Sequence, residues 1–76
     1  MDRKDVKKIL LSINPHIKNH LNRKTSLIHD GIIDSFDIMQ FLLKVEQKKK
    51  KKIKFNKVSR EIFHNLDTIV NFIRKL

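Results

Sequence analysis

The chain has 76 residues, which leaves room for one domain because typical domains run to about 100 to 150 residues. A large catalytic pocket is therefore not expected. The absence of cysteine excludes disulfides, thiolate zinc sites and a thiol nucleophile of the chain's own, and it fits a reducing compartment. The charged first residues and the short apolar runs indicate neither a signal peptide nor a membrane span, so we expect a cytoplasmic protein.

Charge is unevenly distributed along the sequence. Eighteen Lys and Arg against eight Asp and Glu give a net charge of +10, which suggests nucleic acid or an anionic membrane as partner. However, the window from Thr25 to Leu43 has no Lys or Arg and contains Asp30, Asp34 and Asp37. Five of the lysines form one linear block, Lys48 to Lys52, and the basic residues are not gathered on one recognition helix. We therefore expect no specific nucleic-acid binding.

The N-terminal third predicts one helix and a long connection. Apolar residues recur at three- and four-residue steps, which predicts a helix from about Asp2 to Ile13. Pro15 ends this helix and, with Asn14 as N-cap, can begin a short extra turn over His16 to Leu21. The connection continues from Asn22 to Ile33 as a polar stretch followed by an ordered loop whose apolar side chains reach a core.

A second helix is predicted to begin near Asp34 or Ser35. Asp34 followed three residues later by Asp37 resembles a capping box with Asp in place of Glu. The predicted apolar stripe of this helix consists of Met39, Leu42, Leu43 and Val45. Successive helical residues point about 100° apart, so the lysines from Lys48 to Lys52 cannot share one face and repel one another. We expect the helix to fray there.

The pattern of the C-terminal part predicts an extended segment, a short helix and a final helix. Ile53 and Phe55 alternate with Lys54, which predicts an extended segment with both apolar side chains on one side. A short helix is predicted over Val58 to Phe63, and an amphipathic last helix follows a break near Asn65. The aromatic side chains predicted to lie in the core are Phe41, Phe55, Phe63 and Phe72. The expected fold is all-α: a small four-helix bundle with three longer helices, one short helix and a long loop between helices 1 and 2, spanning 1–76 as a single domain.

The most informative string is Asp30-Gly31-Ile32-Ile33-Asp34-Ser35-Phe36-Asp37, at the end of a loop and the start of a helix. A serine hydroxyl in this position is exposed, and a phosphodiester on it would meet unsatisfied backbone N–H groups and the positive end of the helix dipole. That charge interaction is worth about 0.3 to 1 kcal/mol. The purely structural interpretation is that Ser35 or Asp34 caps the helix, since both residue types are common at helix starts.

These residues resemble the acyl carrier protein family, whose members carry Asp-Ser-Leu or a similar tripeptide at the start of their second helix. Here the tripeptide is Asp34-Ser35-Phe36, and the resemblance covers nearly the whole chain. It implies that Ser35 receives 4′-phosphopantetheine from coenzyme A, and that Asp34 is read by the phosphopantetheinyl transferase or caps the helix. It also implies that Phe36, Asp37 and Met39 contact partner enzymes. The chain departs from the family in Phe36, in its lysine run and in Asn56, which stands where proline is frequent.

The resemblance implies a carrier that catalyses nothing itself. Acyl or aminoacyl cargo would be held as a thioester on the arm and presented to loading and downstream biosynthetic enzymes, and the chain is expected to be a monomer. Two alternatives remain open: a small basic helical module that binds nucleic acid or anionic membrane, and an unmodified adaptor with the carrier fold. The lysine run is interpreted as a solvated helix end, a docking patch for an acidic partner, or a nucleic-acid or membrane contact.

The four histidines do not predict a metal site. His16 and His20 are four residues apart and can share a helix face, but no third ligand is nearby and the His-Glu-x-x-His pattern is absent. His29 and His64 are predicted to be isolated residues on the surface or in loops.

Overall fold

The computed structural model describes residues 1–21 and 26–76, and in this part of the chain it contains three α-helices and no strand. The α-helices are α1 (Arg3–Ile13), α2 (Ser35–Lys49) and α3 (Leu66–Arg74), and the 3₁₀ turns are η1 (Pro15–Asn19), η2 (Phe55–Lys57) and η3 (Arg60–Phe63). The prediction of an all-α fold is confirmed. The short helix predicted over Val58 to Phe63 is a 3₁₀ turn instead, because Asn65 caps α3 directly afterwards and leaves room for only one turn. Residues 22–25 of the predicted connection lie outside the described residues.

The three α-helices begin in the same way, which explains why their starts are well predicted. In each, the side chain of the N-cap residue accepts the backbone N–H three residues later at 2.9 Å, and the side chain at that position reaches back to the N-cap. The pairs are Asp2 with Asp5, Asp34 with Asp37, and Asn65 with Thr68. These reciprocal bonds satisfy N–H groups that a helix start otherwise leaves without partners. The Asp5 N–H also holds the pKa of Asp2 below its ordinary value of 3.8.

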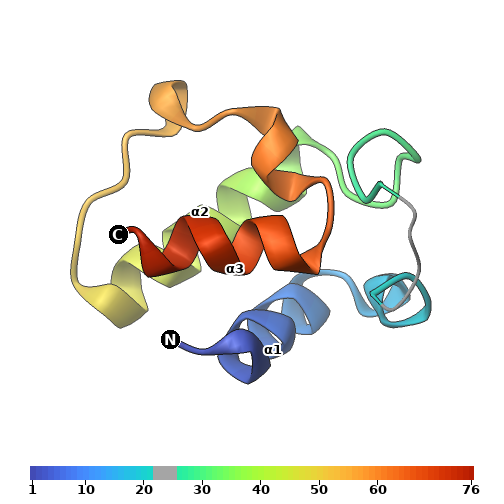
Figure 1. Ribbon diagram of the computed structural model, residues 1–76, viewed down its shortest axis with the longest axis horizontal. Coiled ribbons are helices and arrows are strands. Elements are labelled where there is room, and N and C mark those ends of the chain that lie inside the picture. The colour runs from blue at the N-terminus through green and yellow to red at the C-terminus, as the bar shows by residue number, and fades with distance from the viewer. Residues whose placement is uncertain (22–25) are drawn as a thin grey trace.

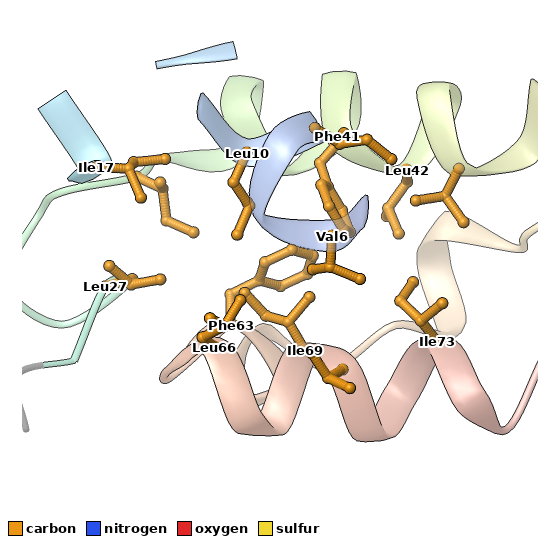
Figure 2. Close-up of a cluster of buried hydrophobic side chains, with 14 of the residues drawn as sticks. Val6, Leu10, Ile17, Leu27, Phe41, Leu42, Phe63, Leu66, Ile69 and Ile73 are labelled. Atoms are coloured by element: carbon orange, nitrogen blue, oxygen red, sulfur yellow. The ribbon is translucent and has the colours of Figure 1, made fainter. Parts of the chain in front are cut away.

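The core lies between the helices, with α1 in contact with both α2 and α3 (Figure 1). Figure 2 shows its centre, where Phe41 from α2 meets Phe63 from η3. Their ring centroids are 5.6 Å apart and the rings are perpendicular, an edge-to-face arrangement that aromatic pairs prefer. The fully buried large side chains are Phe41, Phe63, Leu10, Ile17, Leu27, Leu42, Ile69, Ile73, Val6 and Val45. They come from every helix and from the loop before α2, so the single core also fixes that loop.

Two predictions about apolar side chains are wrong. Leu42, Val45 and Phe41 are buried as predicted, but Met39 is 51 % exposed and Leu43 is 45 % exposed. Residues 41, 42 and 45 share the helix face that the other elements cover, whereas 39 and 43 lie beyond its edge. Phe55 is 39 % exposed, because the extended segment ends at Lys54 and the chain turns into η2 at Phe55.

The lysine run marks the end of α2. The helix stops at Lys49, and Lys50 adopts the left-handed conformation with φ 55°, as expected for a segment where repulsion opposes further helix. The Lys49 Nζ donates to the Ile73 carbonyl at 3.2 Å, and the Lys51 Nζ donates to the Leu76 carbonyl at 2.6 Å. Part of the run therefore fastens the end of α2 to the end of α3. Within the described residues, the helices are all too short or too polar to cross a bilayer.

Candidate functional site

Ser35 is the first residue of α2 and is exposed. The capping of the helix does not use its side chain: the Asp34 Oδ1 accepts the Asp37 N–H at 2.9 Å, and the Asp37 Oδ2 accepts the Asp34 N–H at 3.3 Å. Among the described residues, the Ser35 hydroxyl has no hydrogen-bond partner. The interpretation of Ser35 as the helix cap is therefore wrong, because Asp34 has that role. The Ser35 side chain lies exposed next to the cap, and the cap does not use its hydroxyl.

The loop before α2 holds this position from the other side. The Ile33 N–H donates to the Leu27 carbonyl at 3.0 Å, and the side chains of both residues are buried. The Asn14 side chain, next to η1, donates to the Ile32 carbonyl at 3.1 Å. Gly31 has φ +73°, a value that a residue without a Cβ adopts at no steric cost. Ser35 thus stands on a fixed backbone although it lies at a junction between loop and helix.

A hollow of about 170 Å³ opens beside Ser35. One wall comes from α2 and the other from the segment that contains η2 and the start of η3, which runs back over the top of Figure 1 toward the first turn of α2. The lining residues are Ser35, Ile38, Met39, Leu42, Phe55, Val58, Ser59 and Arg60. Most of these side chains are apolar, and Arg60 adds a positive charge. The sequence did not indicate the second wall, because nothing in the local pattern of residues 55–60 shows that they return to Ser35.

The predicted partner-binding residues differ in what they offer. Phe36 is 65 % exposed and Met39 is 51 % exposed, and together with Leu43 they follow helical spacing along one side of α2. Large exposed apolar side chains in one strip are typical of contact surfaces. Asp37 is half-buried, and its carboxylate takes part in the cap of α2. The apolar strip of Phe36, Met39 and Leu43 is therefore better suited to partner contact than Asp37 is.

The lysine run lies far from this site. Ser35 and Lys49 are the two ends of α2, a helix of 15 residues, so a rise of 1.5 Å per residue places them about 20 Å apart. That separation exceeds the Debye length of about 8 Å at physiological salt. The charges close to Ser35 are instead Asp34, Asp37 and Arg60.

The histidines are arranged differently from the prediction. His16 and His20 lie on and just after η1, exposed and half-buried respectively. His29 and His64 are not isolated: their ring centroids are 6.2 Å apart. The reason is a backbone hydrogen bond of 2.8 Å from the Leu27 N–H to the His64 carbonyl, which brings the loop before α2 beside the junction of η3 and α3.

In comparisons with known proteins, no family model matches the chain, and a search of curated proteins finds no match. The functional interpretation therefore depends on the residues themselves, above all on Ser35, the paired aspartates beside it and the hollow.

Proposed function

We propose that this chain is a carrier protein of the acyl carrier protein type, with 4′-phosphopantetheine attached to Ser35. The observation that carries the proposal is the exposed Ser35 hydroxyl on the first residue of α2, left unused because Asp34 and Asp37 cap the helix between them. The order of elements supports it: a first helix, a long connection ending at Asp34, a second helix that begins with Ser35-Phe36, the short η3 and a last helix. In this proposal residues 1–76 form one carrier domain of four-helix architecture.

The local electrostatics suit a phosphodiester on Ser35. The arm would be linked through the serine oxygen, at the end of α2 where the helix dipole is positive and backbone N–H groups point outward. Arg60 lines the same hollow and adds a cation on the facing segment. The carboxylates of Asp34 and Asp37 oppose a second negative charge, but each accepts a backbone N–H within the cap. The arm would supply the thiol that a chain without cysteine lacks.

The hollow suits an apolar part of the cargo. Its volume of about 170 Å³ gives room for several groups of methylene size. Ile38, Leu42 and Val58 contribute apolar surface, and burial of each methylene is worth about 0.8 kcal/mol. A short acyl or apolar aminoacyl group on the arm therefore fits better than a long chain.

The apolar strip of Phe36, Met39 and Leu43 would contact the phosphopantetheinyl transferase and the enzymes that load and use the cargo. It begins one residue after Ser35, so an enzyme docked on it would have its active site within reach of the arm. The chain itself would catalyse no step. Its cytoplasmic location and monomeric state stay predictions.

Incubation with coenzyme A and a broad-specificity phosphopantetheinyl transferase tests the proposal. Intact-mass measurement should show one added arm on the parent chain and none on Ser35→Ala. Ser59→Ala is the matched control, because Ser59 lines the same hollow and is also exposed, and it should be modified like the parent. Modification of Ser35→Ala would contradict the assignment. Failure of the parent chain with every transferase, its native one included, would favour the unmodified adaptor.

The nucleic-acid alternative is tested separately. A chain of net charge +10 should bind polyanions weakly and lose that binding as salt rises, because such affinity comes from counterion release. A submicromolar, sequence-selective complex at physiological salt would contradict the carrier assignment.

A further inference from the structure

Two segments far apart in the sequence bring together three side chains that can bind a metal. His29 lies in the loop before α2, Glu61 lies in η3 and His64 follows η3. One ligand atom of each side chain lies within 4.8 Å of the other two. The His29 Nε2 is 3.1 Å from one Glu61 carboxylate oxygen and 3.4 Å from the other. We propose that His29, Glu61 and His64 form a binding site for one Zn²⁺ ion.

The donor set suits zinc. Two imidazole nitrogens and one carboxylate oxygen are ligands that Zn²⁺ accepts at about 2.0 to 2.2 Å, with a fourth position open to water. Ligand atoms at those bond lengths in a tetrahedral shell are about 3.3 Å apart. His29 and Glu61 already have this separation, and their side chains are 62 % and 68 % exposed, so they can rotate toward His64. The required adjustment is at most about 1.5 Å, the difference between 4.8 Å and that spacing.

The backbone around the three ligands is already in place. The Leu27 N–H donates to the His64 carbonyl at 2.8 Å and joins the two segments. A nearby serine side chain holds the backbone of each of two ligands. The Ser26 Oγ accepts the His29 N–H at 3.1 Å, and the Ser59 Oγ accepts the Glu61 N–H at 3.2 Å. Zinc binding would therefore order side chains more than backbone, and the entropic cost of binding is reduced accordingly.

An ordinary surface ion pair does not account for the arrangement. A pair between His29 and Glu61 alone does not involve the His64 ring, and exposed pairs of this kind contribute about 0 to 1 kcal/mol. The Nδ1 of His64 is buried and has no hydrogen-bond partner among the described residues. Leaving a buried polar atom unpaired is costly, and such atoms are rare in folded proteins. Zinc bound through Nδ1 would give this buried atom a partner.

Zinc at this site would fasten the loop that precedes Ser35 to the segment that forms the second wall of the hollow. Because the ligands come from both segments, the ion would bind the folded chain in preference to the unfolded one and raise its stability. The site does not include Ser35, so the inference stands apart from the proposed function, and Ser35→Ala should bind zinc as the parent does.

Zinc titration of the tag-free chain, followed by calorimetry and by NMR of the histidine rings, tests the proposal. One equivalent of Zn²⁺ should shift the ring signals of His29 and His64 and leave those of His16 and His20 in place. With Zn²⁺ at ten times its Kd, the Tm should rise by about 5 °C or more. His29→Ala and Glu61→Gln should each weaken binding at least about tenfold, since loss of even an outer partner of a ligand costs 10- to 100-fold. Both changes are at exposed side chains, so the variants should fold.

His16→Ala is the matched control, because it removes an exposed histidine outside the cluster, and it should bind zinc like the parent. Binding lost in His16→Ala, ring shifts confined to His16 and His20, or no binding with Zn²⁺ at millimolar concentration would each overturn the proposal.

Discussion

Substitution of Asp34 separates the two roles assigned to it, the helix cap and recognition by the transferase. Its Oδ1 accepts the Asp37 N–H at 2.9 Å, and asparagine at the same position offers an oxygen of the same geometry without the charge. Alanine removes both the hydrogen bond and the charge. Comparison of Asp34→Asn with Asp34→Ala therefore measures the cap and the charge separately.

The expected stability changes follow from the cap geometry. Loss of an N-cap side chain to alanine costs about 1 kcal/mol, within a range of about 0.5 to 2. Loss of the charge alone costs about 0.3 to 1 kcal/mol, the value of an anion at a helix N-terminus. A change of 1 kcal/mol shifts the Tm of a domain of this size by about 4 to 8 °C. Asp34→Ala should therefore lower the Tm by at least several degrees, and Asp34→Asn by clearly less.

The loading assay gives the second measurement. Under conditions where both variants are folded, each should accept phosphopantetheine more slowly than the parent if the transferase reads the carboxylate. Asp2→Asn at the N-cap of α1 is the matched control, because it alters the same position of another helix and should not change loading. Loading of Asp34→Asn at the rate of the parent would refute transferase recognition of Asp34 and leave it as a helix cap only.

Three further changes test the fold. Phe63→Ala removes the partner of Phe41 from the core and should cost about 3 to 5 kcal/mol, comparable to the whole stability of so small a domain, so circular dichroism should show a largely unfolded chain. Gly31→Ala places a Cβ where φ is +73° and should cost at least about 1 kcal/mol in chemical denaturation, while an unchanged midpoint would show that the loop relaxes. The Asp5 N–H lowers the pKa of Asp2 in the folded state, so Asp2 contributes stability that is present above pH 3.8 and lost as the pH falls below it. The Tm of Asp2→Asn should therefore fall less over that acid range than the Tm of the parent. Identical acid profiles of the two chains would contradict the cap.

Helix starts were predictable because they depend on residues three apart in the sequence. Asp34 and Asp37 meet wherever a helix begins at Ser35, whatever the rest of the chain does, and Asn65 behaves in the same way before α3. The signal for the end of α2 in the lysine run was also local, since the repulsion that opposes further helix arises between neighbouring lysines. The position of Ser35 at a helix start followed directly from these signals.

The faces of α2 and the surroundings of Ser35 were not predictable in the same way. Met39 and Leu43 are large apolar side chains like Leu42, yet they are largely exposed, because within residues 1–21 and 26–76 the other elements pack against a different face of the helix. Phe55 and Arg60 reach the hollow beside Ser35 through the path of the chain between α2 and α3, which no local spacing encodes. The meeting of residues 29 and 64 depends in turn on one backbone hydrogen bond between distant segments. Long-range placement of this kind follows from the packing of the whole core.

The mass of the intact protein isolated from its own cell tests the central claim most directly. If the chain is a carrier, a substantial fraction should be heavier by one 4′-phosphopantetheine arm, and fragmentation should place the arm on Ser35. A cargo still held as a thioester would add further mass that hydroxylamine removes. A chain that is entirely unmodified in cells, or that carries the arm on another residue, would contradict the carrier assignment at Ser35.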